Sequence, residues 1–332
     1  MVFAKAEIGI DLGTSNILIY ENSKGIVLNE PAIIVIDSKT DKVVAVGSEA
    51  KDMVGKTPEN LVALRPLTNG IINDFDLTAE LLKRLLKKSI PSVRKPTFVV
   101  NISTDSTSVE QRAIHNALSA YGARNIHFIE DPVAAAIGAE LPIEEPVASV
   151  ILDIGGGTSE IGIISFGGVV AARSVQIGGN TFDEKIVQLL REKHKVLIGS
   201  QTAEQLKMTI GHVHPNHKEE KLDVIGRNLI TGLPESINVS SYDIYRAIKE
   251  SLEKIAAAVH ETLEKCPPEL SGDIVDHGIV LTGGGALLKG MKEWLMEETK
   301  VPIFMAPRPL ESVALGAGDA LAMIANLKQS KY

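Results

Sequence analysis

Residues 150–164 read VILDIGGGTSEIGII, and this stretch decides the fold that we predict. A short apolar run ends at Asp153, three glycines follow, and an apolar-rich run resumes after Thr158. This pattern predicts a β-hairpin with a polar tip. Because glycine lacks a Cβ, the backbone N–H groups of the tip can converge on an anion, and Asp153 lies beside them to bind a metal ion. For this stretch alone, an ordinary glycine-rich hairpin is the alternative.

A second copy of the pattern near the N-terminus favours phosphate binding. Residues 8–19 read IGIDLGTSNILI, with an apolar run, Asp11, a bend at Gly13 and another apolar run. Turn residues follow at 24–25 after this copy and at 167–168 after the other, so each copy starts a three-stranded meander. We therefore predict one duplicated domain.

Size and composition indicate an α/β protein of about two domains. The chain has 332 residues, of which 44% are hydrophobic and 23% are charged. With 34 basic and 42 acidic residues the net charge is −8, which argues against nucleic acid as the main partner. The single cysteine, Cys266, rules out a disulfide framework. Since no apolar run approaches about eighteen residues and no signal peptide fits, we expect a cytoplasmic protein.

Strand and helix patterns alternate along the chain and predict parallel strands flanked by helices. We place the first half at residues 1–141, with an inserted smaller subdomain at about 32–70. The second half would cover 142–332, with an inserted subdomain at about 181–240. The last helix, 311–327, begins with small residues, which allow it to cross another helix closely, back toward the first half.

Two aspartates and three glycine-containing segments form the predicted site. Glycines between a strand end and a helix start, at residues 283–286, present unpaired N–H groups to an anion or a nucleoside. Asp11 and Asp153 on facing hairpins would hold a hydrated Mg²⁺ against a polyphosphate, because Mg²⁺ prefers one or two carboxylates plus phosphate oxygens and water. Phosphoryl transfer then needs positioning, charge neutralisation and one group that orients the attacking oxygen.

Five motifs resemble those of the ATPase superfamily that contains actin, sugar kinases and heat-shock chaperones. They are Asp11-x-Gly-Thr, Glu130-Asp131-Pro-x-Ala-Ala-Ala, Asp153-x-Gly-Gly-Gly-Thr, Gly283-Gly284-Gly285-Ala and Ala314-x-Gly-x-Gly. Phrases along the whole chain, among them RPLTNGIINDFD, IGRNLITGLP and CPPELSGDIVD, resemble more narrowly the bacterial actins of the MreB family. The resemblance implies an actin-like ATPase fold, with two duplicated ribonuclease-H-like domains, an inserted subdomain in each, and a nucleotide cleft between them.

The resemblance also implies which residues bind ATP and Mg²⁺. The metal would lie near Asp11 and Asp153. Glu204 and Lys207 match the helix that lines ribose and adenine, although a solvated pair on one helical face is the alternative. The nucleotide-binding residues implied are Asp11, Gly13, Thr14, Ser15, Asn16, Asp153, Gly155, Gly156, Gly157, Thr158, Glu204, Gln205, Leu206, Lys207, Gly283, Gly284, Gly285 and Ala286.

The catalytic position departs from the family pattern. The water-orienting acid of the family is the glutamate immediately before the proline, and here that position holds Asp131. An aspartate before a proline is also an ordinary helix N-cap, with Pro132 at the first helical position. Because the Asp131 side chain is one methylene shorter, we expect it to act as the catalytic group in a slow hydrolysis of ATP.

The implied function is that of a filament-forming bacterial actin, a cell-shape cytoskeleton that organises cell-wall synthesis at the membrane. The implied partners are further copies of the chain, the inner face of the cell membrane, and membrane proteins of cell-wall synthesis. From the residues alone, a sugar-kinase-like phosphotransferase fits equally well. In that case a hydroxyl group rather than water attacks the γ-phosphate.

Residues 83–95 are the expected membrane contact. They include six basic residues and no acidic one. Basic charge near anionic lipid contributes about 1 kcal/mol per residue. Ile90 and Val93 would form a partly apolar tip, at the place where the family carries a membrane loop. A solvated helix face is the alternative.

Overall fold

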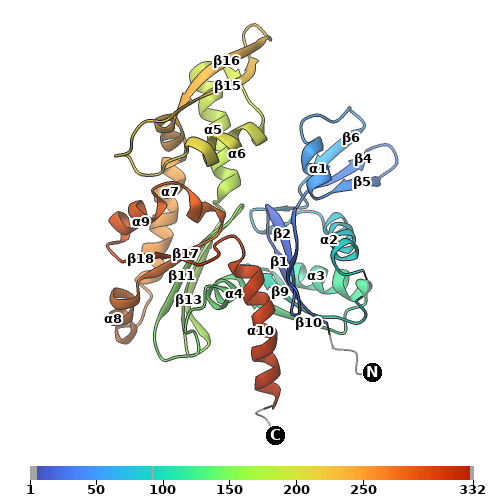
Figure 1. Ribbon diagram of the computed structural model, residues 1–332, viewed down its shortest axis with the longest axis vertical. Coiled ribbons are helices and arrows are strands. Elements are labelled where there is room, and N and C mark those ends of the chain that lie inside the picture. Colours follow the sequence, from blue (N-terminus) through green and yellow to red (C-terminus); the bar gives the residue numbers. More distant parts are fainter. Residues whose placement is uncertain (1–5, 92, 330–332) are drawn as a thin grey trace.

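A computed structural model describes residues 6–91 and 93–329, and it describes side chains as far as residue 321 (Figure 1). Two five-stranded sheets form the centres of two halves. In the first sheet β1, β2 and β3 form an antiparallel meander, and β9 and β10 continue it in parallel from β1. The order is β10-β9-β1-β2-β3, with bounds β1 Glu7–Leu12, β2 Asn16–Glu21, β3 Gly25–Pro31, β9 Thr97–Ile102 and β10 Asn125–Glu130.

The second sheet repeats this order and these directions. An antiparallel meander of β11, β12 and β13 is extended in parallel by β17 and β18. The order is β13-β12-β11-β17-β18, with bounds β11 Ser149–Ile154, β12 Ser159–Ser165, β13 Gly168–Val175, β17 Ile279–Thr282 and β18 Ile303–Met305. The two predicted hairpins are therefore β1–β2 and β11–β12, the first two strands of each meander. The two sheets share one topology, which is the arrangement that a duplicated domain gives.

Two smaller sheets stand above the large ones (Figure 1). Both lie within the segments that we expected to be inserted, whose limits stay predictions. The first segment holds β4 Ile34–Asp37, β5 Lys42–Val46, β6 Leu61–Leu64 and α1 Ser48–Met53, followed by the hairpin β7 Leu67–Thr68 and β8 Ile71–Ile72. The second segment holds β14 Val196–Leu197, β15 Lys221–Asn228 and β16 Pro234–Ser240, with α5 Gly179–His194 and α6 Ser200–Ile210 beside them.

The remaining helices cover the sheets because each has one apolar face. On α2, the leucines at 81, 82, 85 and 86 are all buried. A capping box of Thr107 and Glu110 begins α3, and Gly122 ends it in the left-handed conformation. The bounds are α2 Phe75–Ser89, α3 Ser108–Tyr121, α7 Ser241–Leu263, α8 Pro268–His277, the 3₁₀ helix η1 Gly284–Leu287 and α9 Met291–Thr299.

Helices α4 (Asp131–Gly138) and α10 (Ser312–Gln329) cross between the two halves (Figure 1). The crossing is close because it is made by glycines. A Cβ on Gly316 would lie 1.8 Å from the backbone oxygen of Ala134, and one on Gly138 would lie 1.8 Å from that of Ser312. Although α4 follows the first sheet in sequence, it packs on β11 and β12, and α10 packs on β1 and β9. The small residues at the start of α10 thus allow its close crossing with α4.

One prediction at α4 needs correction. Asp131 is the first residue of the helix, and the N-cap is Glu130, which makes no side-chain capping bond within the described part of the chain. The Asp131 carboxylate instead accepts a hydrogen bond from Asn101 at 2.5 Å. The strand β10 extends to Glu130, so Asp131 is the first residue of the helix and does not occupy the capping position.

The expected membrane tip also differs from the prediction. Ile90 is only 2% exposed and belongs to the core beneath α2, and Val93 packs against the same core. Ile90 is therefore not an exposed apolar tip. Ser92, which precedes Val93, lies outside the described residues.

Acidic groups on α2 itself and on β3 pair with the basic segment. Lys83 and Arg84 contact Glu80 at 3.0 and 2.8 Å, and Lys88 contacts Glu30 at 2.5 Å. These contacts offset part of the positive charge that the segment shows in the sequence. Within residues 6–91 and 93–329, no helix is both long and apolar enough to cross a membrane.

Candidate nucleotide site

A cavity of about 520 Å³ lies between the two sheets and is lined by residues from both halves. It brings together segments separated by more than a hundred residues in the sequence. Of the predicted site residues, those that line it are Asp11, Gly13, Thr14, Ser15, Asn16, Asp131, Asp153, Gly155, Gly156, Gly157, Thr158, Glu204, Lys207, Gly283, Gly284 and Gly285.

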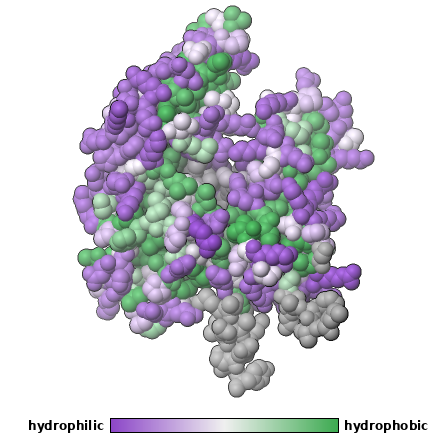
Figure 2. All heavy atoms as spheres, viewed as in Figure 1, coloured by the Kyte–Doolittle hydropathy of each residue, from purple (hydrophilic) through white to green (hydrophobic). Residues whose placement is uncertain are grey.

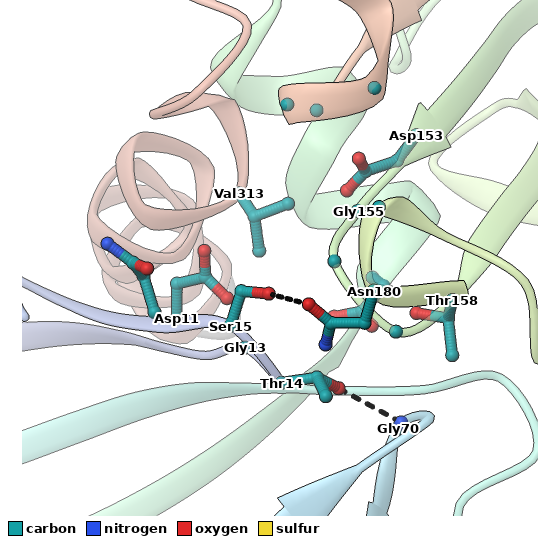
Figure 3. Close-up of a pocket in the computed structure, with 18 of the residues that line it drawn as sticks. Asp11, Gly13, Thr14, Ser15, Gly70, Asp153, Gly155, Thr158, Asn180 and Val313 are labelled. Atoms are coloured by element: carbon teal, nitrogen blue, oxygen red, sulfur yellow. Dashed lines mark hydrogen bonds between the residues drawn. The ribbon is translucent and has the colours of Figure 1, made fainter. Parts of the chain in front are cut away.

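The two glycine-containing hairpin tips face each other across this cavity (Figure 3). The Ser15 hydroxyl, on the first tip, donates to Oδ1 of Asn180 at 3.1 Å, and Asn180 lies in α5 of the second half. A Cβ on Gly156 would lie 1.9 Å from the Ser15 hydroxyl, so the second tip needs glycine for this approach. The Gly70 N–H donates to the Thr14 hydroxyl at 3.0 Å and places the β7–β8 turn beside the first tip. The tips can therefore hold one polyphosphate from two sides.

Asp11 and Asp153 occupy equivalent places, on the first strand of each sheet just before its tip. Burial raises the pKa of Asp11 to about 7, with a hydrogen bond from Asn101 acting against the rise. Burial raises the pKa of Asp153 to about 8, and the charges of Asp11 and Glu160 add to it. Gly283, at φ +82°, lies so close that a Cβ would be 2.1 Å from Oδ1 of Asp153. Because the negative charges of Asp11 and Asp153 repel each other, a nearby cation is needed for both to be ionised at once.

The residues fit a magnesium ion that is also held by the substrate. Oδ1 of Asp153 is buried and has no hydrogen-bond partner among the described residues. No group of three or more His, Cys, Asp or Glu side chains in the described part of the chain could hold a metal ion by itself. Mg²⁺ needs no such group, because it binds through one or two carboxylates together with phosphate oxygens and water. Asp11 and Asp153 are the two carboxylates available for it.

Asp131 lines the same cavity and carries a perturbed carboxyl group. Burial raises its pKa well above the usual value, and the negative charges of Glu160, Asp11 and Asp153 raise it further. The hydrogen bond from Asn101 acts in the opposite direction. Buried acids with shifted pKa values in a cavity are typical of functional sites. Asp131 follows β10, whose carboxyl end lies at the same sheet edge as that of β1.

Glu160 connects the two halves through hydrogen bonds. It is buried on β12, at 2% exposure, and accepts hydrogen bonds from Ser103 at 2.6 Å and from the Thr104 hydroxyl at 3.2 Å. Both donors follow β9 of the first half. Burial raises the pKa of Glu160, and the hydroxyl and backbone donors oppose the rise.

Glu204 and Lys207 line the cavity but also bind other residues. Lys207 contacts Asp183 at 2.9 Å and donates to the backbone oxygen of Gly179 at 2.8 Å. Burial raises the pKa of Asp183 to about 6 even though Lys207 stabilises its ionised form. Glu204 pairs with Lys51 of α1 at 2.9 Å, so this helix meets the first half across the cleft. The alternative of a solvated pair does not hold for Lys207, because its side chain is only 11% exposed.

Three predicted residues do not line the cavity. Leu206 and Ala286 are buried in the core of the second half, and Gln205 is exposed. The helical period explains two of them, since residues next to Glu204 and Lys207 in sequence point to other faces of α6. Their part in nucleotide binding stays a prediction.

Sequence reasoning missed several polar residues that line the cavity, including Asn101 and Asn180. Asn101 is the next-to-last residue of β9, whose carboxyl end lies at the same sheet edge as that of β1. Ligands bind beyond the carboxyl ends of parallel strands, so this position was a usable signal. Asn180 gave no comparable signal, because only the folded chain brings α5 to Ser15.

Three comparisons with known proteins agree with this geometry. The family model described as MreB/Mbl protein matches residues 5–329. The cell shape-determining protein Mbl of Bacillus cereus is 45% identical over 328 residues, which are 98% of this chain and 98% of that protein. The cell shape-determining protein MreB of Escherichia coli is 45% identical over 325 residues, 96% of this chain and 94% of the relative.

A solved structure supports the fold independently of the sequence motifs. The crystal structure of MreB 5 of Spiroplasma citri bound to AMPPNP matches with a TM-score of 0.94 and 33% identity. The match covers 99% of this chain and 100% of that one. The predicted α/β, actin-like ATPase fold is thereby confirmed.

Proposed function

The chain belongs to the MreB/Mbl family, and we propose that it is a filament-forming bacterial actin that binds ATP with Mg²⁺ and hydrolyses it slowly. The filaments would serve as a cell-shape cytoskeleton in the cytoplasm, attached to the inner face of the membrane and working with membrane proteins of cell-wall synthesis. The observation that carries the proposal is the pair of facing glycine tips with Asp11 and Asp153 beside them in one cavity.

The site residues have separate tasks in this proposal. Backbone N–H groups of the two tips bind the phosphates, and Ser15 and Asn180 fix how far apart the tips lie. Asp11 and Asp153 would hold the cation, which neutralises charge on the phosphate oxygens when bound. Asp131 orients the attacking water, and the hydrogen bond from Asn101 fixes the direction of the Asp131 carboxylate. Catalysis then follows mainly from positioning and electrostatic stabilisation, as phosphoryl transfer requires.

Self-association has a candidate contact at the far end of the β15–β16 hairpin. Large apolar side chains are exposed there, and Figure 2 shows green spheres among purple ones at this end of the molecule. Ile225 is 71% exposed, Ile230 79% and Leu233 65%. When such an apolar surface meets a different surface of the next copy, and the rotation between copies does not close a ring, the contact repeats as a filament.

Sedimentation with ATP and Mg²⁺, followed by electron microscopy of the pellet, tests assembly. We expect the parent to sediment as filaments, and Ile230→Ser with Leu233→Ser to remain in the supernatant with nucleotide affinity unchanged. Val109→Ser, at a 62% exposed site on α3, is the matched control and should sediment like the parent. If the parent stays monomeric in every nucleotide and salt and transfers the γ-phosphate to a sugar, the phosphotransferase function replaces this one.

Membrane attachment, in this proposal, depends on basic charge rather than on an apolar tip. Lys87 in the last turn of α2 is exposed, and so are Arg94 and Lys95, which follow the helix. Flotation with anionic vesicles should fall for a variant with these three residues changed to Glu, and the parent should not float with neutral vesicles. Ile90→Ser is not a clean test, because it places a hydroxyl group in the core and lowers stability. Equal flotation of the parent with both kinds of vesicle would contradict the charge argument.

A further inference from the structure

The side chain of Asn101 lies between the two acids of the first half. It is 6% exposed, near the end of β9. Its Nδ2 donates to Oδ1 of Asp131 at 2.5 Å and to Oδ1 of Asp11 at 3.1 Å. Its Oδ1 accepts a hydrogen bond from the Leu12 N–H at 2.6 Å. One amide group thus contacts an expected metal ligand, the expected water-orienting acid and the backbone between β1 and the phosphate tip.

The direction of this amide follows from the chemistry of its partners. The Leu12 N–H can only donate, so the atom that faces it must be the amide oxygen. The NH₂ group is therefore turned toward the two carboxylates, which can only accept when they are ionised. The opposite orientation would place two donors together and an oxygen against two carboxylates. The backbone of β1 in this way fixes the rotamer through which Asn101 reaches Asp131.

We propose that Asn101 is a positioning residue for ATP hydrolysis, which sets the direction of the Asp131 carboxylate and keeps it apart from Asp11. The two hydrogens of its NH₂ group diverge in one plane, so both carboxylates are held in fixed directions by a single rigid group. This proposal rests on the proposed ATPase function. It adds a cause for the orientation of the Asp131 side chain. The register of β9 and β10 does not supply this cause, since it pairs Asn101 with Ile129 and not with Asp131.

The position of Asp131 explains why such a residue is needed here. Asp131 is the first residue of α4 and not its cap, so helix capping does not fix the direction of its side chain. The nearby charges of Glu160, Asp11 and Asp153 all repel its ionised form. Asn101 is the donor that the described residues supply to its carboxylate.

Two variants of Asn101 separate positioning from a purely structural role. Asn101→Asp keeps an acceptor for the Leu12 N–H but loses the donor, whereas Asn101→Leu has a similar shape and loses both. We expect single-turnover hydrolysis to fall about 10- to 100-fold in both, as for other residues that orient a reacting group through a second contact. Affinity for a fluorescent ATP analogue should change far less in Asn101→Leu, because the glycine tips are untouched. Asn125→Leu, at the exposed start of β10, is the matched control and should behave like the parent.

A double-mutant cycle with Asp131→Ala decides between the two roles. If Asn101 acts through Asp131, Asn101→Leu should change hydrolysis by no more than about twofold once Asp131 is alanine, within the scatter of independent sites. Equal losses in both backgrounds would show a structural role and overturn the proposal. So would an Asp131→Ala variant as fast as the parent, because nothing would remain to be positioned.

Unfolding of the nucleotide-free variants gives a readout that is independent of hydrolysis. Removing either partner leaves the other without its contact, so the losses in unfolding free energy for Asn101→Leu and Asp131→Ala should not add. Strict additivity would mean that the two side chains do not interact, and the proposal fails on that result alone. A parent that binds and hydrolyses no ATP would instead refute the proposed function, whatever the cycle in unfolding shows.

Discussion

Lengthening the side chain at position 131 should speed the hydrolysis of ATP. The Asp131→Glu variant restores the residue that the family pattern places before the proline. In the structure Asp131 lies at the cavity wall, bound to Asn101 at 2.5 Å, and contributes no helix cap that the change would remove. Since Pro132 and the small residues of α4 are unchanged, the variant should fold like the parent.

The expected magnitude follows from the added length. One extra carbon–carbon bond moves the carboxylate by up to about 1.5 Å. A displacement of about 1 Å at a reacting group can change a rate by about 100-fold. That factor corresponds to about 2.7 kcal/mol in the activation free energy. We therefore expect Asp131→Glu to hydrolyse ATP between about 10 and about 100 times faster than the parent, with similar nucleotide affinity.

Single-turnover hydrolysis, with protein in excess over radiolabelled ATP, measures the chemical step without product release. Asp131→Ala should be slower than the parent. Glu130→Ala is the matched control, because Glu130 precedes it and makes no side-chain capping bond among the described residues, so its rate should not change. An Asp131→Ala variant as fast as the parent would refute the reasoning, and another group would have to orient the water.

Two further predictions concern the helix crossing and the metal-side acids. Gly316→Ala would place a Cβ 1.8 Å from the backbone oxygen of Ala134 and should lower the free energy of unfolding by about 1–3 kcal/mol. Gly272→Ala, which meets nothing within 4 Å, is the control for thermal unfolding, and equal melting points would contradict the close crossing. Folding raises the pKa values of Asp11 to about 7 and Asp153 to about 8, so in metal-free buffer their contribution to stability is present at low pH and is lost as pH rises through about 7 to 8. Cation binding releases these protons, so the stabilisation by Mg²⁺ and ADP in thermal unfolding should be larger at pH about 8 than at pH about 6, and a shift independent of pH would contradict the assignment.

The sequence alone determined the two hairpins and their chemistry. Apolar runs that end in an aspartate and glycines specify a strand, a polar tip and a second strand. These rules are local, because the alternation of side chains along a strand and the backbone freedom of glycine both involve near neighbours in sequence. Asp11 and Asp153 could therefore be placed beside the tips before the fold was known, and their binding of a cation stays a prediction. The leucine face of α2 and the capping box of α3 also follow from patterns between near neighbours.

Tertiary structure decided what depends on contacts between distant residues. Local patterns do not show that Ile90 packs into a core, that Lys207 is enclosed by Asp183, or that Leu206 turns away from the cavity. The same holds for Asn101, an ordinary strand residue in sequence. Its amide is directed by a backbone N–H 89 residues away. Only the pairing of β1 with β9 creates that contact, because hydrogen bonds act over a few ångströms of space and not along the chain.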